Sequence, residues 1–175
     1  VLAELASIQS RYFQKMLVNA KCAPHYVRTL FEQDPESPFL KTFSEGAGGC
    51  PAGSHYMGIR PNGDMTPCPY LPLFGGNLRE QSFDSIWSGS ELFQNIRGRK
   101  ELGGRCGSCE FNGFCGGCRA RAYGVTGDYM AEDPLCTYQP GLHPDAPVRL
   151  SGRAVEYGTE ASKRIHWEVD AEERL

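Results

Sequence analysis

The sequence lacks long hydrophobic runs and has no excess of positive charge. None of its 175 residues lies in a run of 18 apolar residues, so no segment is typical of a membrane-spanning helix. The net charge of −3 excludes a polycationic surface of the kind that binds nucleic acid non-specifically. The first 17 residues carry Glu4, Arg11 and Lys15 in an amphipathic pattern, which is not the pattern of a secretory signal. We therefore expect a cytoplasmic protein with no membrane or nucleic-acid partner.

Glycine and proline are abundant. The 21 glycines and 12 prolines make up 33 of 175 residues, well above the roughly 12% of average usage. This composition predicts a loop-rich fold that is stabilised partly by something other than apolar packing. Metal binding can supply that stability, because its free energy then counts as folding free energy.

The sequence contains eight cysteines, and four of them lie within thirteen residues: Cys106, Cys109, Cys115 and Cys118. Disulfides at such spacing are strained, because each needs Cα atoms about 4.4–6.8 Å apart at a fixed torsion. A metal gathers thiolates from a folded loop more easily, and interspersed glycines allow the backbone turns that this requires. Without a secretion signal, we interpret the cysteines as reduced metal ligands.

Eight cysteines divide into two sets of four, which leaves two kinds of metal site open. Four thiolates hold one [4Fe–4S] cluster, and four thiolates also hold a structural zinc ion. The gap of five residues between Cys109 and Cys115 is short for a zinc ribbon, whose cysteine pairs lie further apart. The spacing therefore favours iron–sulfur clusters, with zinc as the alternative.

The hydrophobic pattern predicts a small α+β fold. Apolar residues at three- and four-residue steps predict a helix over residues 1–18, and Pro, Ser and Gly predict a loop over 33–54. Residues 55–68 are typical of a β-hairpin that turns at Asn62 and Gly63 and ends near Cys68. Short helices are expected over 82–87, 90–96 and 119–123, the first two with serine N-caps.

The order of the cysteines resembles the SPASM domain, a C-terminal extension of many radical S-adenosylmethionine enzymes that carries auxiliary [4Fe–4S] clusters. The resemblance rests on Cys50, on Gly63 and Cys68 with four residues between them, on the run from Cys106 to Cys118, and on Cys136. It covers roughly residues 20–138, with one departure: two residues instead of three separate Cys115 from Cys118. The residues around the cysteines, such as 21–25, 49–53 and 115–123, resemble the branch that includes haem d1 biosynthesis and the alternative haem route.

The resemblance implies two interleaved ligand sets for two [4Fe–4S] clusters. The first set would be Cys50, Cys68 and Cys118 with Cys22 as the fourth ligand, and the second would be Cys106, Cys109, Cys115 and Cys136. Because Cys115 and Cys118 then hold different clusters, the interleaving would tie the two cluster lobes together.

The resemblance also implies a division of the chain. Residues 1–19 would be the terminal helix of a preceding radical S-adenosylmethionine barrel, 20–139 the SPASM domain, 140–152 a linker and 153–175 the start of a C-terminal appendage. No Cys-x3-Cys-x2-Cys motif occurs, so S-adenosylmethionine and a third cluster would belong to a missing N-terminal part, and we expect no catalytic residue here. The implied partners are a tetrapyrrole substrate and an electron donor such as ferredoxin or flavodoxin.

Four other side chains are candidates for substrate or cluster contacts. Arg119 and Arg121 follow Cys118 and would donate to cluster sulfurs or grip a substrate carboxylate, or else form salt bridges with Asp128 or Asp133. His25 would approach the first cluster or be a structural residue. Tyr70 would line a substrate cavity or pack over the cluster. The alternatives for the whole chain are a peptide-modifying radical maturase and a non-catalytic zinc-binding module.

Overall fold

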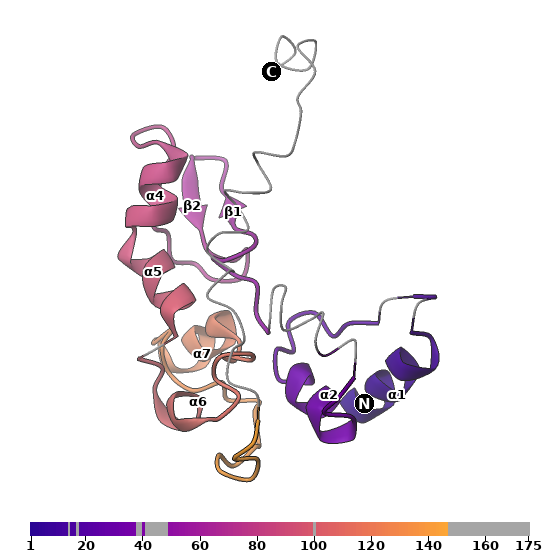
Figure 1. Cartoon of the computed structure of the whole chain (residues 1–175). Coiled ribbons are helices and arrows are strands. Elements are labelled where there is room, and N and C mark those ends of the chain that lie inside the picture. The colour runs from indigo at the N-terminus through magenta and orange to yellow at the C-terminus, as the bar shows by residue number, and fades with distance from the viewer. Residues whose placement is uncertain (14, 17, 38–39, 41–48, 100, 147–175) are drawn as a thin grey trace.

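Helices and a small antiparallel sheet form the part of the chain that the computed structural model describes, which is residues 1–13, 15–16, 18–37, 40, 49–99 and 101–146 (Figure 1). The helices are α1 (Leu2–Arg11), α2 (Tyr26–Gln33), α4 (Phe83–Gly89), α5 (Glu91–Gly98), α6 (Gly104–Ser108) and α7 (Arg119–Thr126). The strands are β1 (Gly58–Ile59), β2 (Asp64–Thr66) and β3 (Gly76–Asn77). This is the predicted α+β class.

The sheet has the strand order β1-β2-β3, and both pairings are antiparallel. The predicted hairpin between β1 and β2 is confirmed. Its turn requires glycine at Gly63, where φ is 96° and a Cβ atom would lie 2.7 Å from Asn77 Oδ1. Pro67 and Pro69 end β2 just before and after Cys68, because proline cannot donate to a ladder. The third strand was not predicted, since two residues carry no alternating pattern.

The two helices after the sheet are also confirmed. Ser82 caps α4 by accepting a hydrogen bond from the backbone N–H of Ser85 at 3.2 Å. Met65 of β2, Ile86 of α4 and Phe93 of α5 are buried together, so both helices pack on the sheet through one apolar cluster. This packing holds the hairpin, and with it Cys68, in a fixed place.

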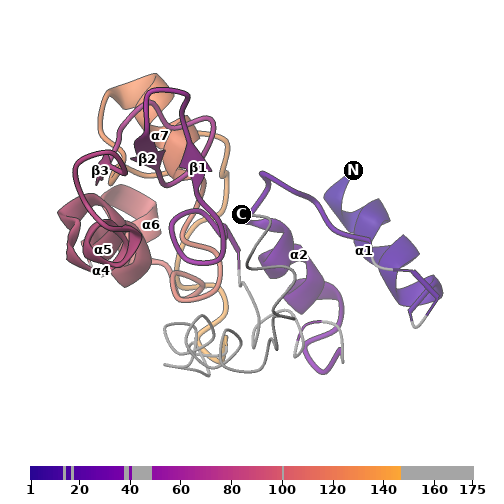
Figure 2. The same cartoon turned by 90° about the horizontal axis from the view of Figure 1, so that it is seen from above.

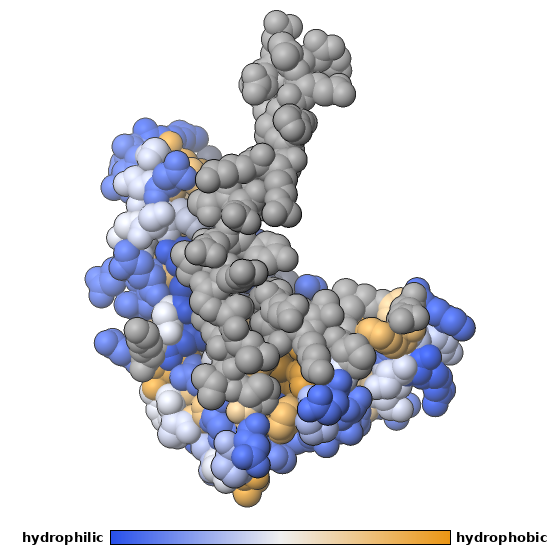
Figure 3. Space-filling view, in the orientation of Figure 1, coloured by the Kyte–Doolittle hydropathy of each residue, from blue (hydrophilic) through white to orange (hydrophobic). Residues whose placement is uncertain are grey.

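Helix α1 is shorter than predicted. It ends at Arg11 instead of residue 18, and Gln9, which is buried, accepts a hydrogen bond from the backbone N–H of Val18 as the chain turns back. Phe13 and Met16 remain exposed beyond the helix. Figure 3 shows hydrophobic surface on the side of the molecule where α1 lies. The packing partner of α1 is α2, which the sequence analysis missed.

The elements gather in two groups in both views of the molecule (Figures 1 and 2). Helices α1 and α2 lie on one side, and the sheet with α4, α5, α6 and α7 lies on the other. Phe114, from the cysteine-rich stretch, is buried in the same apolar cluster as Tyr26 and Leu30 of α2, which links the groups. Among the described residues, no helix is both long and apolar enough to cross a membrane.

The serine caps give a matched test of the fold. We expect Ser82→Ala to lower the free energy of unfolding by about 1 kcal/mol, because the N-terminal amides of α4 lose their side-chain acceptor. Ser90, at the same position before α5, makes no side-chain cap hydrogen bond, so Ser90→Ala is the control and should change stability much less. Urea unfolding of both variants measures the difference, and equal losses would contradict the assignment of the cap.

Candidate iron–sulfur sites

The first candidate site is a cavity of about 730 Å³ that all four cysteines of the first predicted set line: Cys22, Cys50, Cys68 and Cys118. These residues come from four separate segments. Cys22 precedes α2, Cys50 precedes the sheet, Cys68 follows β2, and Cys118 is the N-cap of α7. The fold therefore gathers thiols that lie up to 96 residues apart along the chain (118 − 22).

The second candidate site is a smaller cavity of about 30 Å³, lined by Cys106, Cys109, Cys115 and Cys136. Cys106 lies in α6 and Cys109 caps its C-terminus.

Two glycines explain why Cys115 and Cys118 face different cavities. Gly116 and Gly117 both have positive φ, 60° and 62°, so the chain takes two successive left-handed turns between the two cysteines. A Cβ atom on Gly117 would lie 3.2 Å from the sulfur of Cys106, and one on Gly116 would lie 2.8 Å from Cδ of Arg99. Two residues are thus enough to redirect the chain, provided that both are glycine.

The donor atoms that the two sites share are cysteine thiols, four lining each cavity. Among the described residues, no three His, Cys, Asp or Glu side chains are arranged to hold one metal ion. A [4Fe–4S] cluster makes a different demand, because each of its four irons takes one thiolate. Four thiols around one cavity meet that demand in each site.

Burial disfavours the thiolate form of these cysteines when no metal is bound. Burial raises the pKa of the Cys50 and Cys109 thiols, and it raises the pKa of Cys115 to about 12. Such thiols stay protonated at neutral pH and are unreactive. Binding of a metal would replace these protons and remove the cost of burying bare thiolates.

Comparison with known proteins agrees with this chemistry. The family model described as an iron–sulfur cluster-binding domain, SPASM, matches residues 50–110. The chain carries a SPASM domain. Relatives whose names refer to S-adenosylmethionine or haem support the resemblance to the radical S-adenosylmethionine family and its haem branch.

Three relatives show the range of the similarity. An AdoMet-dependent heme synthase of Methanosarcina barkeri is 43% identical over 132 residues, which cover 73% of this chain and 38% of the relative. A pre-heme d1 synthase of Dinoroseobacter shibae is 36% identical over 101 residues, 55% of this chain and 25% of the relative. A PqqA peptide cyclase of Granulibacter bethesdensis is 36% identical over 93 residues, 50% of this chain and 25% of the relative. The chain spans less than two fifths of the length of these relatives.

The sulfur atoms of the SPASM domain accept hydrogen bonds from different kinds of donor in the two sites. Cys68 accepts from the hydroxyl of Tyr56 at 3.3 Å and from the backbone N–H of Tyr70 at 3.4 Å. Cys106 accepts from the backbone N–H of Asp133 at 3.3 Å and from the guanidinium of Arg119 at 3.8 Å. Tyr56 was not predicted, because no sequence signal links it to a cysteine twelve residues away.

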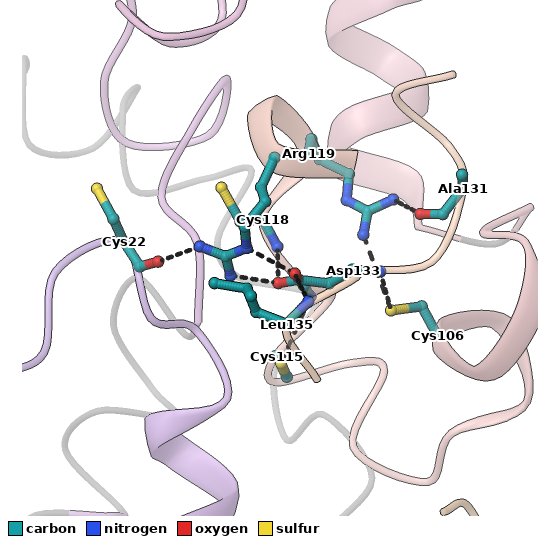
Figure 4. Close-up of polar contacts among 10 residues, drawn as sticks. Cys22, Cys106, Cys115, Cys118, Arg119, Ala131, Asp133 and Leu135 are labelled. Carbon is teal, nitrogen blue, oxygen red and sulfur yellow. Dashed lines mark hydrogen bonds and ion pairs between the residues drawn. The ribbon is translucent and has the colours of Figure 1, made fainter. Parts of the chain in front are cut away.

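Asp133 joins the two sites (Figure 4). Its carboxylate is 1% exposed and accepts from the backbone N–H of Cys118 at 2.9 Å and from Arg121 at 2.5 and 2.7 Å. Burial alone would raise the pKa of Asp133, but these hydrogen bonds outweigh it and lower the pKa. Arg121 also donates to the carbonyl oxygen of Cys22 at 3.1 Å. Arg121 thus forms the salt bridge to Asp133 that the sequence offered as one alternative.

The other two predicted side chains lie in different places. His25 lines the second cavity instead of the first, its Nδ1 atom is buried without a hydrogen-bond partner, and burial lowers its pKa. The backbone turns after Cys22, and this turn places His25 beside the second cavity. Tyr70 lines the first cavity and is 74% exposed, and its role beside a substrate or a cluster stays a prediction.

Glu110 is a second residue that the sequence analysis missed. Its carboxylate accepts hydrogen bonds from the hydroxyl of Tyr138 and from the backbone N–H groups of Gly141 and His143. Burial opposes ionisation, but these donors prevail and lower the pKa of Glu110 to about 2. Glu110 thereby fixes the 138–143 loop, whose Tyr138 forms one wall of the second cavity.

Asp133 and Glu132 are adjacent acidic residues that differ in burial, so they allow a matched test of this site. We expect Asp133→Ala to cost about 3–5 kcal/mol of stability, because it leaves Arg121 and the amide of Cys118 without a buried partner. Glu132→Ala should cost about 1 kcal/mol or less, since the Arg105–Glu132 pair is 31% and 37% exposed. Chemical denaturation under anaerobic conditions measures both. Similar losses would show that Asp133 is not the buried link described here.

Proposed function

We propose that this chain is the auxiliary-cluster part of a radical S-adenosylmethionine enzyme that modifies the carboxylate side chains of a tetrapyrrole. The observation that supports the proposal is that each predicted set of four cysteines lines one cavity. The clusters would accept and relay single electrons when bound, which is the chemistry of iron–sulfur centres. The cysteines would hold them, and the surrounding residues would orient the substrate and exclude water.

The similarity favours a tetrapyrrole over a peptide substrate. The haem synthase relative aligns over 73% of the chain at 43% identity, whereas the peptide cyclase relative aligns over 50% at 36%. The longer alignment extends the likeness beyond a domain that both kinds of enzyme share. A peptide-modifying maturase is therefore the second candidate, and a zinc-binding module without catalytic function is the third.

The first cavity is our proposed substrate-facing site. Its volume of about 730 Å³ lies within the usual range of ligand pockets, about 300–1,000 Å³. Lys21 and the exposed ring of Tyr70 border it, so a cation and an aromatic surface stand beside the first set of thiols. A porphyrin with propionate or acetate groups presents the matching chemistry, a flat apolar ring edged by carboxylates.

The rest of the enzyme follows from the same proposal. Residues 1–19 would end the radical S-adenosylmethionine barrel, 20–139 would be the auxiliary-cluster domain, and 140–152 would lead to an appendage at 153–175. That appendage lies outside the described residues. S-adenosylmethionine and its own cluster would bind to the preceding part, and a cytoplasmic ferredoxin or flavodoxin would supply electrons.

Metal analysis tests the cluster assignment. We expect the anaerobically purified protein to be brown and to contain about eight irons and about eight sulfides. Cys68→Ala and Cys109→Ala should each lower the count to about four, because each removes a ligand from a different cluster. A colourless protein with about two zinc ions would overturn the proposal.

Cys22 receives a separate test because its backbone is unusual. Its φ of 60° is left-handed, which is uncommon outside glycine, and Arg121 holds its carbonyl group. We expect Cys22→Ala to lose iron from the first cluster only, so that Cys22→Ala and Cys68→Ala give similar iron counts. An unchanged count of about eight would remove Cys22 from the ligand set and leave the first cluster with three thiolates.

Substrate binding is tested on the full-length enzyme. We expect iron-coproporphyrin to bind with a shift of its Soret band, and Lys21→Ala to weaken the affinity by about tenfold through loss of one charged contact. Lys15→Ala is the control, because Lys15 does not line the first cavity. No spectral shift at saturating porphyrin, together with binding of a peptide substrate, would favour the maturase alternative.

A further inference from the structure

Arg119 is a buried cation without a carboxylate partner in the described structure. It is 3% exposed, and its guanidinium donates to the carbonyl oxygens of Tyr129 at 2.9 Å and Ala131 at 2.6 Å. Its Nε atom is buried with no hydrogen-bond partner. Burying a charge in this way costs several kcal/mol unless an opposite charge lies nearby. The remaining contact of the guanidinium is the sulfur of Cys106, at 3.8 Å (Figure 4).

Two of the neighbouring arginines differ from Arg119 because carboxylates neutralise them. Arg121 pairs with Asp133 at 2.5 Å, and Arg105, which lines the second cavity, pairs with Glu132 at 2.8 Å. Arg99 donates to the carbonyls of Cys50 and Gly113, so it serves loops of both sites. The charge of Arg99 also favours the Cys115 thiolate, but in the described part of the chain Arg119 is the arginine that donates to a sulfur of the second set.

We propose that Arg119 is the counter-cation of the second iron–sulfur cluster and raises its reduction potential. The inference rests on the proposed function, because it assumes that Cys106 is a cluster ligand. Four thiolates give a [4Fe–4S] cluster a net negative charge, and reduction adds one more electron. A cation that donates to a ligand sulfur stabilises the reduced form more than the oxidised form. Arginine keeps its proton in both states, so the electron enters without a proton.

Other charges near the second site do not replace this effect. Glu110 is negative and lies close enough to raise the pKa of Cys109, so it acts in the opposite direction. It contacts Tyr138 and the 141–143 backbone, whereas Arg119 donates directly to a ligand sulfur. His25 lines the cavity and burial lowers its pKa, but its Nδ1 atom makes no hydrogen bond to a sulfur. Removal of Arg119 should therefore shift the potential downward.

The test measures the potential of the second cluster alone. In a Cys68→Ala background, which lacks the first cluster, dithionite with redox dyes titrates one electron, and electron paramagnetic resonance records the reduced form. We expect Arg119→Gln to lower the reduction equilibrium constant at least about tenfold, which is a shift of about 60 mV for one electron. Arg119→Lys keeps the charge and should shift the potential less.

The matched control is Arg97→Gln, which removes a half-buried cation that donates to the carbonyl of Gly53 and lines neither cavity, so it should leave the potential nearly unchanged. A fully loaded Arg119→Gln protein with an unchanged potential would overturn the inference. If Arg119→Gln loses the cluster, retention of about four irons in Arg119→Lys would support a need for the charge. Loss of iron in both variants would assign Arg119 a packing role only. A wild-type protein without iron would instead refute the proposed function itself.

Discussion

The buried carboxylate of Asp133 is the contact on which both cysteine sites depend. It fixes the amide of Cys118 and, through Arg121, the carbonyl of Cys22, while its own N–H group donates to the sulfur of Cys106. One residue therefore positions thiols in both cavities. Because Asp133 is 1% exposed, its charge is stable only while all these donors are in place. This makes the arrangement of the two sites cooperative.

The hydrophobic core has the same organisation as the cysteines. Among the described residues it is divided into four small clusters instead of one continuous core, each with no more than six buried residues. Cys68 is one of the buried members of a cluster, and Cys109, Cys115 and Cys136 pack against another. Small cores supply little stability on their own. A fold of this kind gains much of its stability when metal binding to the cysteines links the apolar clusters to one another.

Local signals in the sequence were sufficient for the elements that local contacts define. Asn62 and Gly63 predicted the hairpin turn, and Ser82 predicted the start of α4, because turns and caps involve residues within four positions. The grouping of the cysteines came from the resemblance, and each proposed group lines one cavity. Spacing alone would have left iron–sulfur and zinc sites both open.

The sequence could not predict contacts between residues that lie far apart along the chain. Arg121 and Cys22 are 99 positions apart, and Asp133 and Cys106 are 27 apart, so no periodicity connects them. The sequence named both Arg119 and Arg121 as candidates but could not distinguish them. Only the position of Asp133, which neutralises Arg121 and leaves Arg119 facing a thiol, separates their roles. Helix α2 was missed for a similar reason, since its buried face is defined by α1 and by Phe114.

The two sites differ in ways that suit different tasks. The first is wide, its Cys22 is exposed, and its sulfur donors are the neutral groups of Tyr56 and Tyr70. The second is narrow and has a buried guanidinium against one of its sulfurs. The first cavity therefore leaves more room for a large ligand, whereas an electron added at the second would lie beside a fixed cation. The assignment of the Asp133 carboxylate to Arg121 and not to Arg119 is what leaves the Arg119 cation facing the second site.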